Sequence, residues 1–405
     1  TPGTVTVDAA HGDINVAGMQ FASDGYVVQG DAIHLAGSVR EPAQSTIRVG
    51  DGSAQGASYT ATVNSVLTGS TGLVKTDAGT LVLGGDNTYT GGTTIVGGTL
   101  QVGNGGTTGM IAGNVVDNGT LSFSRSDTFG FAGDVSGSGV LKKAGRGTLV
   151  LTGNNTHTGG TIVSDGVLQI GDGGTAGWVA GDIVNNSYLR FNRSDDVVFG
   201  GNISGVGTLL KDGAGKVTLT GNATDDRPSP SAPSIAINSG TLQVGNGGTT
   251  GSISSGSVLN NGSLVFDRSD TYTYAGVVSG NGSLIHAGTG TLIFTNRIYS
   301  PIGIVIAKGT LLMKDAGIVA DTGGSVLNNG TLILDYSAPG GWYASAPITG
   351  SGNLIKRGPG LAILEADNTY TGGTLVSEGT LRIGSSWSTG WVEGDIVNQG
   401  TVEFA

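Results

Sequence analysis

The stretch Gly79–Val102, GTLVLGGDNTYTGGTTIVGGTLQV, recurs along the chain. It returns closely at 147–170, and degenerate copies open at Gly215, Gly290 and Gly360. The successive openings therefore follow one another at intervals of roughly 68–75 residues. Such internal repeats are typical of chains that stack one structural unit on the next, so this repeat constrains the fold more than any single motif.

A shorter period lies inside the long one. Four leucines that follow a Gly-x pair, Leu81, Leu100, Leu121 and Leu141, recur at intervals of about 20 residues. An interval of this length is the size of one coil of a β-solenoid, with three short strands and their turns. One third of the long repeat is about 23 residues, so we expect about three coils in each repeat of roughly 68–75 residues.

Alternation within the strands predicts which side chains point inward. In Thr99–Val102, Leu100 and Val102 point to one side and Thr99 and Gln101 to the other, because side chains alternate along a strand. The same alternation recurs in the other copies at 167–170, 241–244, 310–313 and 380–383. We therefore expect a column of apolar residues inside the coils and a mostly polar row facing water. No helical periodicity competes with this pattern, so the chain is predicted to be all-β.

The glycines and asparagines are typical of turns. Gly contributes 77 of 405 residues, and Gly-Gly and Asn-Gly pairs such as Gly91-Gly92 and Asn118-Gly119 suit turn positions with positive φ. Pairs of asparagines recur at 185–186, 260–261 and 328–329. If equivalent pairs stack, their amides can hydrogen-bond along the solenoid axis.

Charge and composition exclude several functional classes. The net charge of −11 disfavours nucleic acid as a partner. The chain has no Cys and therefore no disulfide or thiolate metal site. No apolar run approaches the length of roughly 18 residues that a membrane-spanning helix needs. The chain stops inside a strand-like run at Ala405, so we expect it to be a fragment of a longer protein.

Two breaks in the repeat divide an otherwise continuous chain. Residues 1–68 already alternate and are predicted to form β-helix coils continuous with the repeat region 69–405. Segment 222–234 contains three prolines, and segment 337–347 is flanked by prolines, so both are predicted to be protruding loops. Because loops on a regular scaffold often carry function, we expect their polar and aromatic residues to contact a ligand: Asp225, Asp226, Arg227, Trp342 and Tyr343.

The motifs that could carry chemistry are better explained as turns. His157 occupies the place that Tyr89 and Tyr370 fill in other copies, and no serine has a nucleophile-elbow context. The Arg125-Ser126-Asp127 triplet recurs three coils apart, too far for a catalytic carboxylate pair. The glycine-rich 103–109 stretch lacks the Lys-Ser/Thr of a phosphate loop and the regular aspartates of a calcium roll. We therefore predict no catalytic residue, no metal and no cofactor.

The repeat resembles the passenger-associated repeat of Gram-negative autotransporters. The pattern GxGxLxK…GxGTLxLxGxNTYTGGT…GxLxV is clearest at 69–102, 137–170 and 350–383. The resemblance implies a right-handed parallel β-helix that is secreted through an outer-membrane barrel, which this chain does not contain. It also implies display at the cell surface or secretion, commonly in adhesins and self-associating proteins. The matching residues are turns and core positions, so they do not identify a ligand.

These observations predict a non-enzymatic adhesin or virulence factor. Its partners would be host cell-surface components or the same protein on a neighbouring cell. Capture of a soluble host protein, such as a complement or protease regulator, for immune evasion is one alternative. A β-helix enzyme acting on polysaccharide is a second alternative, and it requires a groove with clustered charged residues.

Overall fold

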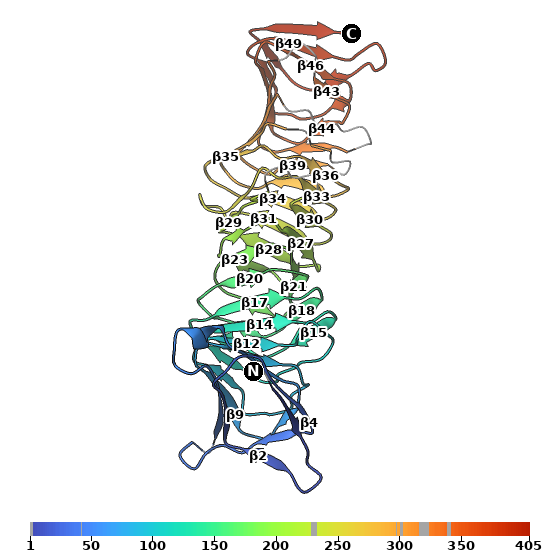
Figure 1. Cartoon of the computed structure of the whole chain (residues 1–405). Coiled ribbons are helices and arrows are strands. Elements are labelled where there is room, and N and C mark those ends of the chain that lie inside the picture. Colours follow the sequence, from blue (N-terminus) through green and yellow to red (C-terminus); the bar gives the residue numbers. More distant parts are fainter. Residues whose placement is uncertain are drawn as a thin grey trace. The chain divides into compact units, whose positions relative to one another are not determined.

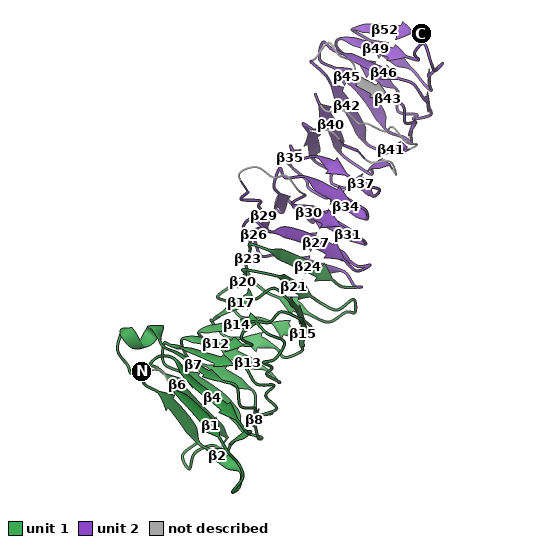
Figure 2. Ribbon diagram, turned by 45° about the vertical axis from the view of Figure 1, so that its right-hand side comes forward, with its two compact units in different colours: residues 1–193 green, residues 194–405 purple. Residues whose placement is uncertain are grey.

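The computed structural model describes residues 3–41, 43–227, 233–296, 298–299, 303–315, 324–337 and 342–405, without the side chains of Trp342 and Tyr343. Two compact units divide the chain, unit 1 at Thr1–Arg193 and unit 2 at Ser194–Ala405 (Figure 2). The proposed boundary at residue 68 lies inside unit 1. Strands on either side of it pair with each other, as Ser45 does with Leu73 and Thr60 with Thr80.

Parallel strands stacked coil upon coil form each unit (Figure 1). The main sheet of unit 1 contains, in spatial order, β1 (Thr4–Val7), β4 (Tyr26–Gly30), β7 (Thr60–Val63), β10 (Thr80–Leu83), β12 (Thr99–Val102), β14 (Thr120–Ser124), β17 (Val140–Ala144), β20 (Thr161–Val163) and β23 (Ile183–Asn185). A second contains β3 (Gly18–Phe21), β6 (Gln44–Val49), β9 (Gly72–Thr76), β11 (Thr93–Ile95), β13 (Val115–Asp117) and β16 (Val135–Ser136). A third contains β15 (Thr128–Phe131), β18 (Thr148–Leu151), β21 (Val167–Ile170) and β24 (Tyr188–Asn192). The shorter ladders are β2 (Ile14–Val16), β5 (Ile33–Leu35) and β8 (Leu67–Thr68), and β19 (Asn154–Asn155) with β22 (Trp178–Val179).

Unit 2 repeats this architecture. One sheet contains β25 (Val197–Phe199), β28 (Lys216–Leu219), β31 (Thr241–Val244), β34 (Ser263–Phe266), β37 (Ser283–His286), β39 (Ile304–Ile306), β41 (Val326–Asn328) and β44 (Ile348–Thr349). Another contains β35 (Thr271–Tyr274), β38 (Thr291–Phe294), β40 (Thr310–Lys314), β42 (Thr331–Asp335), β45 (Asn353–Arg357), β48 (Thr374–Val376) and β51 (Ile396–Asn398). The remaining ladders are β26 (Ile203–Ser204), β29 (Asn222–Ala223) and β32 (Ser252–Ile253); β27 (Thr208–Asp212), β30 (Ile235–Ile237), β33 (Val258–Asn260) and β36 (Val278–Ser279); β43 (Trp342–Ala344), β46 (Leu361–Leu364), β49 (Thr380–Ile383) and β52 (Thr401–Phe404); and β47 (Asp367–Asn368) with β50 (Trp391–Val392).

The all-β parallel β-helix predicted from the sequence is therefore confirmed. The described residues contain one helix, the single 3₁₀ turn η1 (Gln55–Ser58). None of the described helices is long and apolar enough to span a membrane.

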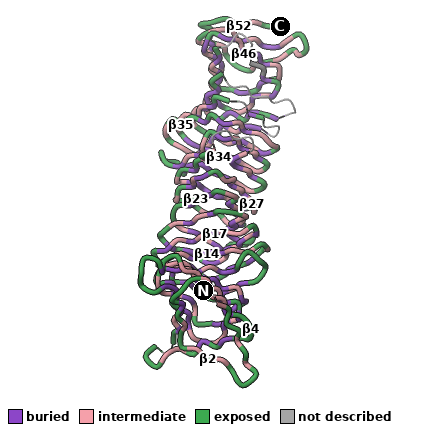
Figure 3. Tube along the Cα trace, in the orientation of Figure 1, coloured by how far each residue is buried: buried purple, intermediate pink, exposed green. Residues whose placement is uncertain are grey.

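The leucine period sets the register of the coils. Leu81, Leu100, Leu121 and Leu141 are direct partners in β10, β12, β14 and β17, and all four are fully buried. Along the strands buried and exposed positions alternate (Figure 3). The inward column is therefore the predicted one, and it removes apolar side chains from water at every coil.

The length of a coil differs from the value obtained by dividing the long repeat by three. The register places about 20 residues between partners, close to the leucine interval. In addition, β18, which opens the second copy of the long repeat, lies in a different sheet from β10, which opens the first. The long repeat thus spans three coils and about a third of another, and each new copy begins on the next face. The prediction of about three coils in each repeat is confirmed, but a coil is shorter than one third of the repeat because the repeat does not contain a whole number of coils.

Asparagines link neighbouring coils through the backbone. The Oδ1 atoms of Asn118, Asn261 and Asn329 accept hydrogen bonds at 3.1 Å from the backbone N–H groups of Ser138, Asn281 and Ser351. The expected stacking of equivalent asparagine amides on one another is wrong, because equivalent pairs stand a whole repeat apart while a coil takes only about 20 residues.

Candidate functional site

The candidate contact residues at the start of the first predicted loop are engaged with the chain itself, while residues 228–232 of that loop lie outside the described part of the structure. Arg227 forms a two-pronged ion pair with Asp225, with Nε–Oδ1 at 2.7 Å and Nη2–Oδ2 at 2.8 Å. The Asp225 side chain is only 5% exposed and that of Arg227 17%. The hydrogen bond from Arg227 lowers the pKa of the Asp225 carboxyl. These two groups hold the segment where it leaves β29, and their role in ligand contact stays a prediction.

Asp226 fixes the same segment to the preceding coil. Its backbone N–H donates to the Gly205 carbonyl at 3.0 Å, and its carboxylate accepts from the Gly205 N–H at 2.7 Å. The predicted loop bounds of 222–234 are too wide, because Asn222–Ala223 form β29 and pair with β32, while Ser234 is buried. This short strand was hidden by the prolines that follow it.

The second predicted loop contains a strand. Trp342–Ala344 form β43, whose residues pair with Ala362, Ile363 and Leu364 of β46. The prediction of a loop over 337–347 is therefore wrong for 342–344, because the alternation that defines a strand is too short to recognise in a Trp-Tyr-Ala triplet. The side chains of Trp342 and Tyr343 lie outside the described part of the structure, so their role as ligand contacts stays a prediction.

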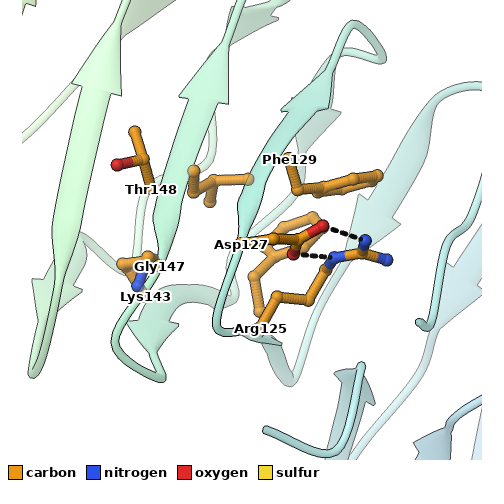
Figure 4. Close-up of a pocket in the computed structure, with 8 residues that line it drawn as sticks. Arg125, Asp127, Phe129, Lys143, Gly147 and Thr148 are labelled. Atoms are coloured by element: carbon orange, nitrogen blue, oxygen red, sulfur yellow. Dashed lines mark hydrogen bonds and ion pairs between the residues drawn. The ribbon is translucent and has the colours of Figure 1, made fainter. Parts of the chain in front are cut away.

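The Arg-Ser-Asp triplets clamp the glycine-rich loops of the preceding coil. The Arg125 guanidinium donates to Asp127 through Nε at 2.9 Å and Nη2 at 2.7 Å (Figure 4). It also donates to the carbonyls of Gly109, at 2.7 Å, and Thr107. Arg268 repeats this arrangement with Asp270 and the carbonyls of Thr249 and Gly251, and Arg193 bonds the carbonyls of Thr175 and Gly177.

The clamp explains the composition of the glycine-rich loop. Gly103 has φ +82°, and an added Cβ would lie 2.5 Å from the Ser124 carbonyl oxygen and 2.8 Å from Arg125 Cγ. Arg125 also lies over the Phe129 ring, 4.8 Å from its centroid. The hydrogen bond from Arg125 lowers the pKa of the Asp127 carboxyl, which is therefore ionised over the physiological range. The triplet thus serves as a structural corner.

The folded-back loops also bury residues expected to face water. Gln169 and Gln243 lie on the outer face of their strands but are almost fully buried. Their Nε2 atoms donate to the carbonyls of Gly171 and Gly245 at 2.8 and 2.9 Å. The expectation of a solvent-facing polar row is wrong at these positions, because the glycine-rich loop covers them.

Two hollows adjoin charged side chains. The hollow beside Arg125 has a volume of about 10 Å³, room for no more than a water, and is lined by Phe123, Arg125, Asp127, Phe129, Lys143, Gly147, Thr148 and Leu149 (Figure 4). The other, of about 410 Å³, is lined by Ile363, Glu365, Arg382, Ser385, Ser386, Trp387 and Ala405. Arg382, which lines this hollow, donates to Glu403 at 2.8 Å through Nε.

A buried lysine closes one corner of each of four repeats, and the sequence analysis assigned it no role. Lys75, Lys143, Lys211 and Lys356 are at most 2% exposed. Each Nζ donates to three backbone carbonyls, for Lys143 those of Ala144, Gly145 and Asp165 at 2.9, 2.6 and 3.0 Å. An ammonium has three N–H donors, so the three carbonyls satisfy it.

Burial decides the protonation of these lysines. It lowers the pKa of Lys75 and Lys143 to about 8, so the ammonium form still predominates at pH 7. Strand parity would have revealed the position, because Lys143 stands two residues after the inward Leu141 and must point the same way.

Two histidines replace repeat residues inside the coils. His157 is fully buried and its Nε2 lies 3.0 Å from Thr161 Oγ1, as the Tyr89 hydroxyl lies 2.8 Å from Thr93 Oγ1. His286 takes the corner of the buried lysines, with Nε2 3.2 Å from the Gly290 carbonyl. Burial lowers the pKa of both. In the described ranges, no three His, Cys, Asp or Glu side chains come together as metal ligands would.

Four segments of the chain match a known repeat family. The passenger-associated-transport-repeat family matches residues 73–102, 141–170, 209–244 and 354–383. The lysine corners lie in all four matched segments.

Three curated proteins are similar to the chain. The adhesin BmaC autotransporter of Brucella suis biovar 1 (strain 1330) is 44% identical over 232 residues, 52% of this chain and 7% of the relative. The autotransporter adhesin/invasin TibA of Escherichia coli O78:H11 (strain H10407 / ETEC) is 26% identical over 212 residues, 51% of this chain and 21% of TibA. An extracellular serine protease of Serratia marcescens is 35% identical over 102 residues, 24% of this chain and 8% of the protease. The chain thus spans a small part of each relative, and no solved structure matches it.

Proposed function

Because the chain is part of an autotransporter passenger with passenger-associated transport repeats, at the cell surface of a Gram-negative bacterium or secreted from it, we propose that it acts as a non-enzymatic adhesin. Its partners are components of a host surface or copies of itself on neighbouring cells. Export would use an outer-membrane translocation barrel. Two relatives named as adhesins, each matching about half of the chain, support this function.

The proposal is supported chiefly by the structural contacts of the lysine, arginine and histidine side chains that could otherwise take part in catalysis. The buried lysines bond backbone carbonyls, the arginines clamp glycine-rich loops, and the two buried histidines occupy corner positions. Such groups stabilise the regular coils, whose outer faces suit many weak contacts that add up when numerous copies stand on one cell.

The test displays the chain on a bacterial surface and measures both adherence to epithelial cells and cell settling. A matched variant replaces residues 224–234 with Thr-His-Thr-Gly-Gly, the shorter corner that the second repeat uses at 156–160. We expect display of the chain to raise adherence to epithelial cells, cell settling or both. If residues 224–234 make the contact, the variant should lower the property that display of the natural chain raised. Display that changes neither property would refute the adhesin function.

The match to a serine protease favours one alternative, an enzymatic passenger. It covers about a quarter of this chain. The purified chain should leave casein and acidic polysaccharide unchanged. Turnover that a single substitution abolishes would show an enzyme instead. A single stoichiometric partner captured from serum would favour capture of a soluble host protein.

A further inference from the structure

The hollow of about 410 Å³ lies beside a glycine-rich loop whose sequence departs from that of the other copies. Loop 384–390 reads GSSWSTG, whereas the other copies read GNGGTTG at 103–109, GDGGTAG at 171–177 and GNGGTTG at 245–251. Trp387 therefore stands where each of the other loops has a glycine. An added Cβ at Gly106 or Gly248 would meet no atom within 4 Å, so this position borders open space.

Hydrogen bonds hold the tip of this loop in place. Ser385 and Ser388 pair as an antiparallel bridge, with the Ser385 N–H donating to the Ser388 carbonyl at 2.7 Å. The Trp387 N–H donates to Ser385 Oγ at 3.2 Å, and the Ser388 hydroxyl donates to the Glu365 carbonyl. The backbone that carries Trp387 is thus fixed, while the residue is 93% exposed. A rigid, exposed aromatic side chain loses little conformational freedom when a ligand covers it.

The strand beside the loop also differs from the other copies. Arg382 takes the place of three glutamines whose Nε2 atoms donate to a carbonyl of the glycine-rich loop: Gln101, Gln169 and Gln243. Arg382 instead donates from Nε and Nη2 to Glu403, at 2.8 and 2.7 Å, and lines the hollow. The volume of the hollow lies within the roughly 300–1,000 Å³ that small-molecule sites occupy.

Two polar groups that line the hollow have unused hydrogen-bonding capacity. Among the described residues, neither the half-buried Glu365 carboxylate nor Arg382 Nη1 has a hydrogen-bond or ion-pair partner. Glu365 stands where other copies have Gly84, Thr152 and Thr220. A carboxylate only accepts hydrogen bonds and a guanidinium only donates them, so a ligand that bonds both must donate and accept.

We propose that this hollow binds a neutral pyranose unit of a glycan. A pyranose has a face of C–H groups that packs on the electron-rich face of an indole, which Trp387 supplies. Its neighbouring hydroxyls can donate to Glu365 and accept from Arg382. An apolar peptide or a lipid chain would cover these two charged groups without satisfying them. The site would make the host-surface contact of the proposed adhesin, so this inference rests on that function.

The charges of the site favour an uncharged sugar. Glu365 and Glu403 supply two carboxylates against the single guanidinium of Arg382, and Glu403 already pairs with that guanidinium. The carboxylate of an acidic sugar would therefore lie beside Glu365 without a cation of its own. The net charge of −11 acts in the same direction over the whole chain.

Binding of methyl pyranosides to the purified full chain tests the site. The probes are the methyl glycosides of glucose, galactose, mannose and N-acetylglucosamine, titrated by saturation-transfer difference NMR. At least one should bind with a Kd on the order of 1 mM, a weak contact that many displayed copies would strengthen. The form of that sugar with a carboxylate at C6 should bind at least roughly tenfold more weakly.

Three substitutions restore the residue types that other copies carry, so the coils should still fold: Trp387→Gly, Arg382→Gln and Glu365→Thr. Each should lower the affinity about tenfold, because it removes the stacking contact or a hydrogen bond to a charged group. Trp391→Phe is the matched control. Trp391 is 49% exposed and does not line the hollow, so this change should leave the affinity unaltered.

Three results would overturn the proposal. They are the absence of saturation transfer to every probe at about 100 mM, equal affinity of the natural chain and Trp387→Gly, and tighter binding of the acidic sugar. The adherence of displaying cells is measured separately. A chain that raises adherence but binds no pyranoside keeps the adhesin function and loses this site. A chain that binds a pyranoside but changes neither adherence nor settling keeps the site and loses the adhesin function.

Discussion

Replacing a buried lysine should destabilise a corner of the coil far more than replacing its outward-pointing neighbour. Lys143 and Lys142 are adjacent in β17, yet Lys143 is 2% exposed and Lys142 points outward. We consider Lys143→Met, which keeps the length and apolar stem of the side chain and removes its ammonium. Lys142→Met is the matched control.

The contacts of Lys143 allow the loss of stability in Lys143→Met to be estimated. The change leaves the carbonyls of Ala144, Gly145 and Asp165 without their donor. A buried unsatisfied polar group costs about 1–3 kcal/mol, so three cost roughly 3–9 kcal/mol. Removing the ammonium also removes the cost of burying its charge, which offsets several kcal/mol of this loss. The expected net loss is about 3 kcal/mol, against less than about 0.5 kcal/mol for Lys142→Met.

Hydrogen exchange is the suitable assay, because coils that contact only their neighbours open locally. Amides of β17 and β20 should exchange roughly a hundredfold faster in Lys143→Met than in the natural chain, as a loss of about 3 kcal/mol requires. Those of β1 and β4 should not change. Equal exchange in Lys143→Met and Lys142→Met would refute the role assigned to the buried ammonium.

Three further predictions concern other corners and the core. Burial lowers the pKa of His157, so the unfolded chain binds protons more readily and stability falls as pH drops below about 6.5; His157→Tyr, the residue of the equivalent corners, should lose less melting temperature between pH 7.5 and pH 5, and an equal loss would contradict this. Arg125→Met removes bonds to Asp127 and to the carbonyls of Thr107 and Gly109, so stability should fall by about 2 kcal/mol and exchange at 103–109 should accelerate, whereas exposed Arg146→Met should have neither effect. Leu121→Ala opens a cavity in the fully buried column and should lower stability in urea by about 2–5 kcal/mol; a loss under about 1 kcal/mol would mean that the column is not packed as described.

The sequence was sufficient for the fold class because its strongest signals are periodic. The spacing of Leu81, Leu100, Leu121 and Leu141 gives the register directly, since parallel coils place residues one coil apart in contact. The long repeat was a poorer guide to the number of residues in a coil, because that repeat does not contain a whole number of coils. The sequence indicated that the glycine-rich loops are corners. It did not indicate that these loops cover Gln169 and Gln243, because that placement depends on the Arg193 and Arg268 clamps from a later coil.

The candidate site was less accessible to sequence reasoning. Proline-rich composition located the segment after β29, but only the structure shows that Asp225 and Arg227 bond each other. The buried lysines and the apolar side chains on both faces of β42 were readable from strand parity. Lys143 shares the parity of Leu141, and the unbroken apolar run Leu332-Ile333-Leu334 must place a large apolar side chain on both faces of β42.

The distance between Gln101 and Val184 tests the stacking of coils most directly. These residues are far apart in sequence but lie four coils apart on one sheet, which corresponds to about 19 Å between backbones. Spin labels on Gln101→Cys and Val184→Cys in the otherwise cysteine-free chain report this distance by pulsed electron paramagnetic resonance. A single narrow distribution centred on that four-coil separation, widened by the label arms, is the predicted result. A broad distribution, or one centred tens of ångströms farther out, would contradict the parallel coil stack on which every proposal here depends.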